Sequence, residues 1–386
     1  MGDWKDKIEL GSLSSVEAVR SKLKLRNCSM VGNDPPEVPL PLDVGDFTLY
    51  ACIGQAFNRT ASVYLAKRNG TQKPCAIRVY QLENGNSSFC LLREVATLRS
   101  LKHPNILSLE DVIVKGTRLL IVNPLMDYGS VRDLLLYRFN LGMVEQHIAF
   151  ILYDVLKGLE YLHSLGWMHR TIRGSHILLS SSGYACLSGF RLAASFVNES
   201  QRLRSLHDFD SNFKTSLLWL APEVLQQFPA GYDLKSDIYS VGITACEMAN
   251  GFPPFADMTS LQMFMEKLRG VTPRLLDGKT LANDEGAENI ETSLNEQRNR
   301  WFSDKFHSVV DICLRFVPSE RPTASELLKH SFFKQCKKER RSAASFLHDV
   351  KPLFIKHENE NAVPTKLGTL WDAEGKDPNF GWSFCE

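Results

Sequence analysis

The sequence predicts an α+β fold in two lobes, the first rich in strands with one key helix and the second mainly helical. Two patterns along the chain indicate this. Apolar residues alternate with a period of two between Phe47 and Val79, which is typical of strands, and from Ser88 the apolar spacing lengthens to that of helices. The 386 residues are 44% hydrophobic and 23% charged, so the chain has enough apolar material for a large core.

The first lobe is expected over about 46–125, after a disordered tail and linker over 1–45. The linker ends in a proline-rich run, which cannot enter the interior of a helix or sheet. Alternation predicts a strand over 47–53 and further strands between 63 and 79. The apolar positions of 88–101 follow a helical period, so this segment is the helix of the first lobe.

The second lobe is expected over about 126–334. A long helix is predicted to begin near Glu145. Another, over 236–250, is apolar nearly all round, which indicates that it is buried. Shorter helical signals occur over 306–314 and 324–332.

Two further segments have a different composition. Residues 275–300 contain glycines, asparagines and several acids, which predicts an exposed insertion in the second lobe. Residues 335–386 are mostly polar and are expected to form a C-terminal tail.

Charge and cysteine usage exclude several classes of protein. The formal net charge of +1 gives no reason to expect a nucleic acid or a membrane as partner. The 9 cysteines lie far apart without a Cys-x-x-Cys pair, so we expect free thiols in a reducing cytosol and no metal site. No signal peptide opens the chain and no run of about 18 apolar residues occurs. The expected location is the cytoplasm, and the basic run 337–341 leaves the nucleus open as a second one.

The first lobe carries a possible phosphate-binding loop. Gly54 follows the first strand, where backbone N–H groups of a glycine-rich loop can approach phosphates. Ala56 and Arg59 stand where further glycines are usual, so a plain hairpin is the alternative. Arg78 ends the run Cys-Ala-Ile-Arg on the third strand, and Glu94 follows on an inward helix face from which it could pair with Arg78.

The second lobe carries several motifs in a fixed order. Their order and separations resemble those of the protein-kinase fold. They stand at the positions where kinases have His-Arg-Asp followed by an Asn, then Asp-Phe-Gly, then Ala-Pro-Glu. The last member is an arginine whose buried guanidinium could donate two hydrogen bonds to the carboxylate of Glu223. The motifs are His169-Arg170-Thr171 with His176, Gly189-Phe190-Arg191, Ala221-Pro222-Glu223, Asp237 and Arg321.

The positions that carry kinase chemistry hold unsuitable residues. Thr171 replaces the catalytic Asp and is no base at neutral pH, and Gly189 offers no carboxylate to Mg²⁺. The imidazole of His176, at the position of the Asn, is a poor ligand for a hard cation. The sequence therefore predicts a pseudokinase without catalytic residues. Glu94, His169, Arg170, Glu223, Asp237 and Arg321 are expected to have structural roles.

The site keeps positive charge, which predicts that a nucleotide is bound without a metal. Arg78 and Arg191 could hold phosphates by charge-assisted hydrogen bonds. In the alternative, both arginines only pair with carboxylates, Glu94 among them. The predicted nucleotide-binding residues are Ile53, Gly54, Gln55, Ala56, Val63, Arg78, Leu125, Met126 and Arg191.

Several segments resemble one family of pseudokinases, the sterile-20-related adaptors (STRAD). The resemblance covers nearly the whole kinase-like region, and Gly-Phe-Arg and His-Arg-Thr depart from active kinases as that family does. The matching segments are 126–130, 169–171, 175–178, 187–191, 219–227, 231–247 and 330–335.

This resemblance implies an adaptor that binds the liver-kinase-B serine/threonine kinase and favours its active conformation. It also implies bound ATP that needs no metal and a third partner, a helical-repeat scaffold of the mouse-protein-25 type. The segment 191–220 would then be a docking surface. Family members end in a Trp-Glu-Phe tail that docks into the scaffold. Here Trp382 and Phe384 keep that spacing, and a disordered tail is the alternative.

Two other functions remain as alternatives. An atypical active kinase would use His169, Asp237 or substrate groups in place of the missing acids. A nucleotide-free scaffold would have a collapsed cleft, and ATP would then not raise its melting temperature.

Overall fold

The computed structural model has an α+β fold. The chain divides into two compact units, which are described separately: one contains the described residues up to 100 with 108–125, and the other contains 101–107 with those from 126 onward. The predicted docking residues Trp382 and Phe384 lie outside the described residues. The structure describes residues 42–44, 46–56, 61–82, 85–115, 117–198, 201–209, 211–281, 297–338, 347, 350 and 352.

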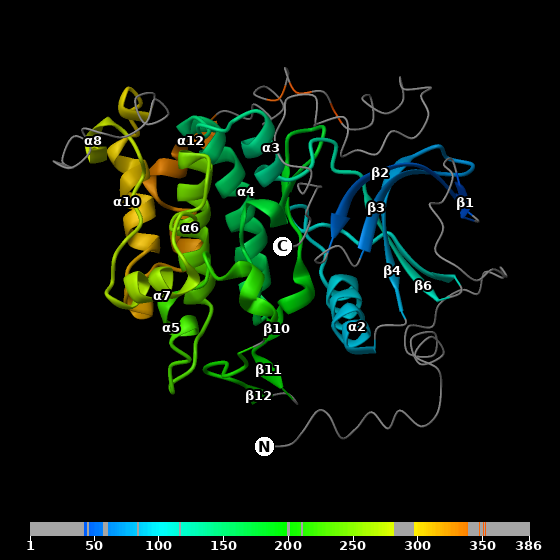
Figure 1. Cartoon of the computed structure of the whole chain (residues 1–386), viewed down its shortest axis with the longest axis horizontal. Helices are drawn as coiled ribbons and strands as arrows, with labels where there is room; N and C mark the ends of the chain where they lie inside the picture. The colour runs from blue at the N-terminus through cyan, green and yellow to red at the C-terminus, as the bar shows by residue number, and fades with distance from the viewer. Residues whose placement is uncertain are drawn as a thin grey trace. The chain divides into compact units, whose positions relative to one another are not determined.

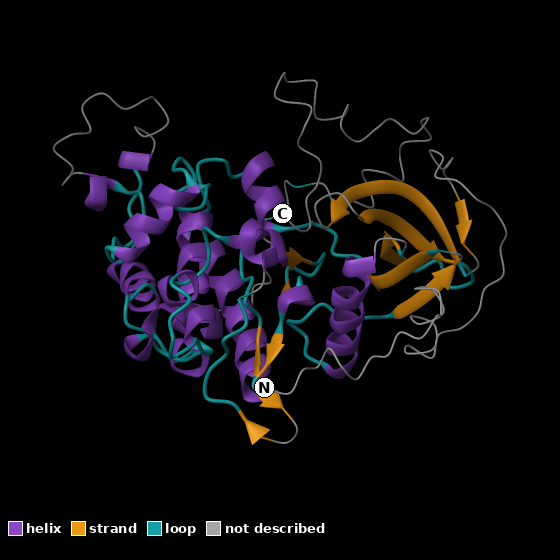
Figure 2. Ribbon diagram, turned by 60° about the horizontal axis from the view of Figure 1, so that its bottom comes forward, coloured by secondary structure: helices purple, strands orange, loops and turns teal. Residues whose placement is uncertain are grey.

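The first unit is built on a six-stranded sheet of antiparallel neighbours in the order β1-β2-β3-β4-β6-β5 (Figure 2). Alternation along its strands buries one set of side chains, among them Phe47, Cys75, Ile77 and Val122. The strands are β1 (Leu42–Val44), β2 (Phe47–Ala56), β3 (Ala61–Arg68), β4 (Pro74–Gln81), β5 (Asp111–Lys115) and β6 (Arg118–Pro124).

Strand β1 corrects one predicted boundary, because it lies inside the segment 1–45 that was expected to be a tail. Leu42 pairs with Leu49 and Val44 with Phe47 at the edge of the sheet. A proline-rich run can directly precede an edge strand, since an edge strand needs no ladder hydrogen bonds on its outer side.

Helix α2 (Gly85–Ser100) lies beside this sheet (Figures 1 and 2). Leu91, Val95 and Leu98 recur at helical spacing and are buried, as the period of this segment predicts. Glu94 lies on the same face and is also buried, at 1% exposure. A carboxylate in this position needs a partner, and β4 supplies one.

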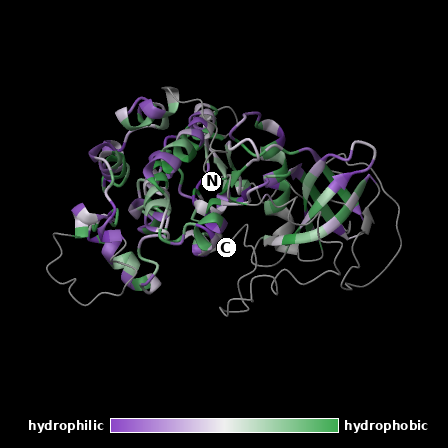
Figure 3. Ribbon diagram, turned by 90° about the horizontal axis from the view of Figure 1, so that it is seen from above, coloured by the Kyte–Doolittle hydropathy of each residue, from purple (hydrophilic) through white to green (hydrophobic). Residues whose placement is uncertain are grey.

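The second unit is mainly helical (Figure 1). Every residue of α6 from Ser236 to Asn250 is buried, in agreement with its apolar pattern. Hydrophobic residues, green in Figure 3, run along the helices of the second unit. The helices are α3 (Val131–Tyr137), α4 (Glu145–Ser164), α5 (Pro222–Leu225), α6 (Lys235–Asn250), α7 (Ser260–Leu268), α8 (Gly278–Leu281), α10 (Asp304–Cys313), α11 (Ala324–Leu327) and α12 (Lys334–Lys338).

Short strands and 3₁₀ turns connect these helices. Most of them lie within residues 167–216, the part of the chain that carries the candidate site. The strands are β7 (Trp167–Met168), β8 (Ile177–Leu179), β9 (Ala185–Leu187), β10 (Ala194–Ser195), β11 (Val197–Asn198) and β12 (Gln201–Arg202). The 3₁₀ turns are η1 (Gly174–His176), η2 (Phe190–Leu192), η3 (Ser211–Ser216), η5 (Pro318–Glu320) and η6 (Ser331–Phe333).

The helix predicted over 324–332 is shorter in the structure. Helix α11 ends at Leu327, and the 3₁₀ turn η6 follows. The break places Phe332 in a stacked contact with Phe306 at 5.0 Å between ring centroids. Packing of these rings therefore outweighs the local helical period.

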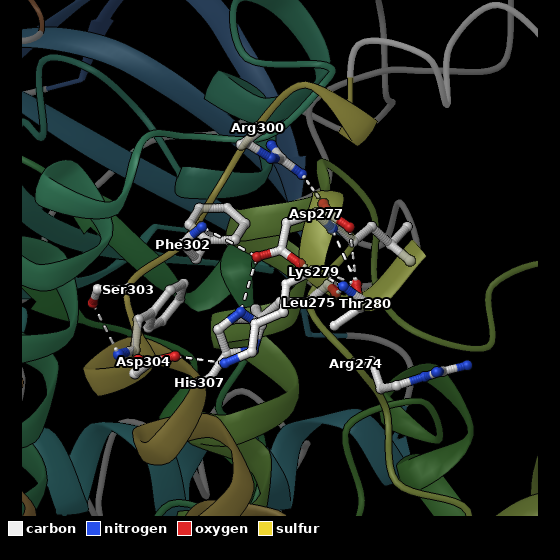
Figure 4. A network of polar contacts seen from close by, with 12 residues as sticks. Arg274, Leu275, Asp277, Lys279, Thr280, Arg300, Phe302, Ser303, Asp304 and His307 are labelled. Atoms are coloured by element: carbon white, nitrogen blue, oxygen red, sulfur yellow. Dashed lines mark hydrogen bonds and ion pairs between the residues drawn. The ribbon is translucent and has the colours of Figure 1, made fainter. Parts of the chain in front are cut away.

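The exposed insertion predicted over 275–300 is also narrower than expected, because both of its ends are packed (Figure 4). Asp277 is 0% exposed, and it accepts hydrogen bonds from the backbone N–H groups of Thr280 at 3.0 Å and Phe302 at 3.1 Å. Its carboxylate also lies 2.9 Å from Nε2 of His307. We call residues 275–281 with 297–307 the insertion neck. Residues 282–296 lie outside the described residues.

A second set of contacts closes the insertion neck. The backbone N–H of Gly278 donates to the carbonyl oxygen of Arg300 at 2.8 Å. The Arg300 guanidinium donates to the carbonyl oxygens of Leu141 at 2.7 Å and Leu276 at 2.9 Å. Polar contacts to the backbone therefore hold both ends of the insertion, a pattern that leaves little hydrophobic signal in the sequence.

In the part of the chain that the structure covers, the helices are either too short or too polar to cross a bilayer.

Candidate functional site

Five of the predicted nucleotide-binding residues lie along β2 and β3 of the first unit. Gly54 pairs with Val63 next to a register shift, and Ala56 pairs with Ala61. Ile53 is buried within the unit, as are Ala56 and Val63. Gln55 is the neighbour of Gly54 on β2, and the loop over 57–60 lies outside the described residues. The pairing carries β2 through Gly54 as far as Ala56.

Arg78 and Glu94 form an ion pair between β4 and α2. Arg78 Nη1 lies 2.8 Å from Glu94 Oε1, and their side chains are 13% and 2% exposed. The same nitrogen lies 3.3 Å from the Tyr80 hydroxyl. The pairing of Arg78 with the carboxylate of Glu94 that the sequence suggested is therefore present.

The remaining predicted nucleotide contacts are also buried. Leu125, at the end of the first unit, is 8% exposed. Met126 opens the main part of the second unit and packs with Leu107, Leu178 and Cys186. Arg191 lies in η2 of the second unit and is 6% exposed.

The loop over 169–176, here called the catalytic loop after its position in kinases, is anchored by Asp237 of α6. The Asp237 carboxylate accepts hydrogen bonds from the backbone N–H groups of His169 and Arg170, both at 2.8 Å. It also lies 2.9 Å from Nε2 of His163. Burial raises the pKa of Asp237, but these hydrogen bonds and the two histidines outweigh it and lower the pKa below its usual value.

Two residues of the catalytic loop show why this anchor is needed. Arg170 has a φ of +68°, a conformation that costs a non-glycine residue energy unless its surroundings hold it. His169 is 0% exposed, with Nε2 2.8 Å from the carbonyl oxygen of Ser188 and its ring against Phe190. Burial lowers the pKa of His169. Both residues are therefore parts of the scaffold.

Thr171 occupies the position of the catalytic Asp and is 3% exposed. Its hydroxyl donates to the carbonyl oxygen of Gly189 at 3.2 Å and lies 3.3 Å from Nδ1 of His169. A hydroxyl engaged in this way links two loops of the second unit. It offers no base to a substrate.

His176 fills the space beside Gly189. The imidazole is 3% exposed, with Nδ1 2.6 Å from the carbonyl oxygen of Thr171 and Nε2 3.4 Å from Arg173. Burial, followed by the charge of Arg173 and by His169, lowers the pKa of His176 well below its usual value, so the ring is neutral. A Cβ atom on Gly189, which has a φ of +79°, would lie only 2.6 Å from Cγ of this ring.

Kinases hold Mg²⁺ with the Asp of Asp-Phe-Gly and the Asn of the catalytic loop. At these positions the chain has Gly189 and a buried neutral His176, which together provide no oxygen ligand. Among the residues that the structure describes, no group of 3 or more His, Cys, Asp or Glu side chains could hold a metal ion. The residues present therefore do not fit the kinase metal.

An ion pair joins Asp208, whose side chain is 55% exposed, to Arg170 of the catalytic loop. The Arg170 guanidinium lies 3.1 Å from Asp208 Oδ2 and 3.0 Å from the Tyr232 hydroxyl, and it also donates to the carbonyl oxygen of Leu192. Tyr232 in turn donates to the carbonyl oxygen of Asp208. This arginine therefore has an anionic partner that belongs to the chain itself.

Two buried basic side chains, Arg173 and Lys267, hold the following segment, 211–220. Arg173 donates to the carbonyl oxygen of Thr215 and lies 5.6 Å from the Trp219 ring. Lys267 of α7 is 1% exposed and donates to the carbonyl oxygens of Leu218 and Leu220, both at 2.7 Å. Burial lowers the pKa of Lys267 to about 7.

The pair Glu223–Arg321 joins α5 to the turn that precedes α11. Two hydrogen bonds of 2.6 and 2.8 Å connect the guanidinium to the carboxylate, and the Arg321 side chain is 0% exposed. Ser236 adds a third hydrogen bond to the carboxylate at 2.6 Å. Such a pair fixes the second unit and has no contact with a reacting group.

The sequence interpretation missed several residues of this network. Asp208 and Lys267 belong to none of the motifs. Arg173 was only a spacer residue of the motif from His169 to His176, and Trp219 and Tyr232 were quoted only within matching segments. Their partners are mostly backbone oxygens far away in the chain, which leave no spacing rule in a sequence. A tryptophan immediately before the Ala-Pro-Glu region was the one available signal.

Comparisons with known proteins agree with the motif order. The model of the protein kinase domain matches residues 52–333. STE20-related kinase adapter protein alpha of Homo sapiens is 40% identical over 334 residues, which cover 80% of this chain and 78% of that protein. The alpha protein of Gallus gallus is 40% identical over 337 residues, covering 81% and 86%. STE20-related kinase adapter protein beta of Homo sapiens is 38% identical over 346 residues, covering 83% and 82%.

Proposed function

The chain belongs to the STE20-related kinase adapter family within the protein-kinase fold, and on this premise we propose that it is a pseudokinase adaptor. It binds the liver-kinase-B serine/threonine kinase and raises the share of that partner in its active conformation. It transfers no phosphate itself.

One contrast within the second unit carries the proposal. Positions that kinases need for chemistry hold Thr171, His176 and Gly189, which offer neither a base nor a metal ligand. The structural contacts around these positions are intact, since Asp237 anchors the catalytic loop and Glu223 pairs with Arg321. Loss of chemistry with an intact scaffold is what an adaptor requires.

The described parts of the segment 191–220, which leave out 199, 200 and 210, support a role in docking. Asp208 already supplies the negative charge that Arg170 needs, and Lys267 and Arg173 hold the following backbone. In active kinases an arginine of this kind often waits for a phosphate on the loop. Here the segment has no need of one, so it is suited to present a constant surface to a partner kinase.

The adaptor binds ATP without requiring a metal. The positive charges of Arg78 and Arg191 support this, because guanidinium groups can bind phosphates directly. A helical-repeat scaffold of the mouse-protein-25 type completes the complex, with Trp382 and Phe384 of the tail as its docking residues. The cysteines of the described residues are free thiols, which supports a cytoplasmic location.

An active kinase that substitutes His169 or Asp237 for the missing acid finds no support. Both residues are 0% exposed, and both side chains are engaged within the scaffold. Neither can reach a substrate hydroxyl without dismantling the catalytic loop.

The deciding experiment measures peptide phosphorylation by the purified partner kinase with its scaffold, with and without this chain. A parallel sample uses a partner whose catalytic Asp has been replaced. We expect a signal that rises only with the live partner. A signal with the inactive partner would mean that this chain transfers phosphate, and no rise in either sample would contradict the partner assignment.

Nucleotide binding is tested separately by thermal unfolding with ATP in EDTA. A bound ligand stabilises by RT ln(1 + [ATP]/Kd), so the Tm should rise with ATP concentration. Arg191→Ala should reduce this rise, whereas Arg204→Ala, at an exposed arginine, should not. An ATP concentration series without any shift would favour the nucleotide-free scaffold.

A further inference from the structure

We propose that His176 and Gly189 are a coupled pair, in which the imidazole occupies the space that a side chain at position 189 would need. The pair keeps a divalent cation out of the nucleotide site, so the chain's independence of metal is built into its packing. This inference rests on the proposed nucleotide site, but its central test needs no nucleotide.

The geometry excludes a side chain at position 189 while the ring is present. A Cβ atom there would lie 2.6 Å from both Cγ and Nδ1 of His176 and 2.8 Å from Cδ2. Carbon atoms in good contact are about 3.5–4.0 Å apart, so the ring or the backbone would have to move by roughly 1 Å. The Asp of an Asp-Phe-Gly motif therefore cannot be added to this structure as it stands.

The ring is not free to move aside. Its Nδ1 lies 2.6 Å from the carbonyl oxygen of Thr171, and its Nε2 lies 3.4 Å from Arg173. The backbone is fixed as well, because Ser188 donates two hydrogen bonds to the carbonyl oxygen of His176, from its N–H at 2.8 Å and its hydroxyl at 3.1 Å. Buried close packing transmits such a displacement to several neighbours.

The electrostatic surroundings act in the same direction. The ring that replaces the Asn is neutral, and the cation of Arg173 lies 3.4 Å from its Nε2. A divalent cation would therefore meet the imidazole of His176 and the positive charge of Arg173 where kinases provide oxygen ligands. Steric and electrostatic effects both disfavour the metal.

The first test is a double-mutant cycle on the Tm of the full chain without ligand. Gly189→Ala adds only the Cβ atom, and Gly270→Ala is its control. Gly270 has nearly the same φ, +77°, and its Cβ would meet nothing closer than 3.8 Å. The control should lower the Tm by roughly 2 °C, the cost of the backbone conformation alone. Gly189→Ala should lower it by about 6 °C or more.

His176→Ala removes every ring atom that the new Cβ would meet. In that background, the additional loss caused by Gly189→Ala should fall to that of Gly270→Ala. The proposal is overturned if Gly189→Ala costs no more than its control, or if its cost is the same with and without the ring.

The second test compares ATP-induced Tm shifts in Mg²⁺ and in EDTA. The native chain and Gly189→Asp alone should show no gain from Mg²⁺, whereas the double variant His176→Asn/Gly189→Asp should gain at least several-fold in apparent ATP affinity. A Mg²⁺-dependent gain in Gly189→Asp alone would refute the role of the ring. If no variant responds to ATP, the proposed nucleotide site is wrong, and the ligand-free cycle alone decides the coupling.

Discussion

Two buried aspartates of the second unit, Asp237 and Asp277, each hold a loop by accepting hydrogen bonds from its backbone. Each is 0% exposed, accepts two backbone N–H groups and lies 2.9 Å from a histidine Nε2. Burial raises the pKa of each, but hydrogen bonds outweigh it and lower both pKa values below the usual range. Asp237 holds the catalytic loop, and Asp277 holds the insertion neck (Figure 4).

The surroundings of the two carboxylates differ. Asp237 lies on the buried helix α6, and it stabilises Arg170 at a positive φ. Fewer protein atoms surround Asp277, and the ion pair Lys279–Asp304 next to it is exposed. The same hydrogen-bond pattern should therefore contribute more at Asp237, because a deeper carboxylate costs more when it loses its partners.

The largest effect is expected for Asp237→Asn. An amide retains one acceptor oxygen but turns its NH₂ group toward a donor, so one buried N–H group loses its partner and Arg170 loses support. We expect a loss of about 3–5 kcal/mol in the free energy of unfolding, measured with denaturant. Asp257→Asn, at an exposed acid, is the control and should change little.

Asp277→Asn tests the other half of the comparison. We expect a smaller loss of about 2 kcal/mol in the same denaturant experiment, since the partner His307, whose side chain is 14% exposed, can form hydrogen bonds with water instead. A loss as large as that of Asp237→Asn would show that depth does not distinguish the two aspartates.

The pH dependence of stability tests the catalytic loop separately from the insertion neck. The catalytic loop contains His176, and burial lowers the pKa of this histidine well below 6.5. Between the folded pKa and about 6.5, the unfolded chain binds a proton that the folded chain does not. Stability should therefore fall as the pH decreases from 7 to 5. His176→Asn should reduce this slope by up to about 1.4 kcal/mol per pH unit. Parallel unfolding profiles for the two proteins would contradict this.

The smallest effect is expected at the surface of the insertion neck. Lys279→Met removes the ion pair with Asp304, whose side chains are 52% and 88% exposed. Water and salt screen such a pair, and its formation costs side-chain entropy. The Tm should not change measurably in 0.15 M salt, whereas a clear decrease would mean that the surface pair supports Asp277.

Motif spacing in the sequence led to Asp237, Arg78 and Glu94, and periodicity predicted the buried helix over 236–250. These features are local or follow fixed separations, so one sequence can indicate them. Asp277 could not be found in this way. It lies in a segment of acids and glycines that resembles a loop, and its partners are backbone groups brought close only by folding.

The candidate site shows the same limit. The sequence indicated which residue types are missing at positions 171, 176 and 189. It did not indicate that the ring of His176 lies where a side chain of residue 189 would begin, because that contact depends on the backbone conformation at both positions. The carboxylate beside Arg170 was missed for a similar reason, since Asp208 lies in a segment without regular structure.

The contact between His176 and Gly189 also restricts how this chain could change over generations. If the proposed coupling holds, a mutation that restores the acid at position 189 meets the ring and lowers the stability of the fold before it offers any benefit. The ring must be lost first, in a step that by itself supplies no metal ligand. Recovery of catalysis thus requires two substitutions in one order, with a third at position 171 still to come. For a pseudokinase of the kind proposed here, such an ordered path would make a return to catalysis rare.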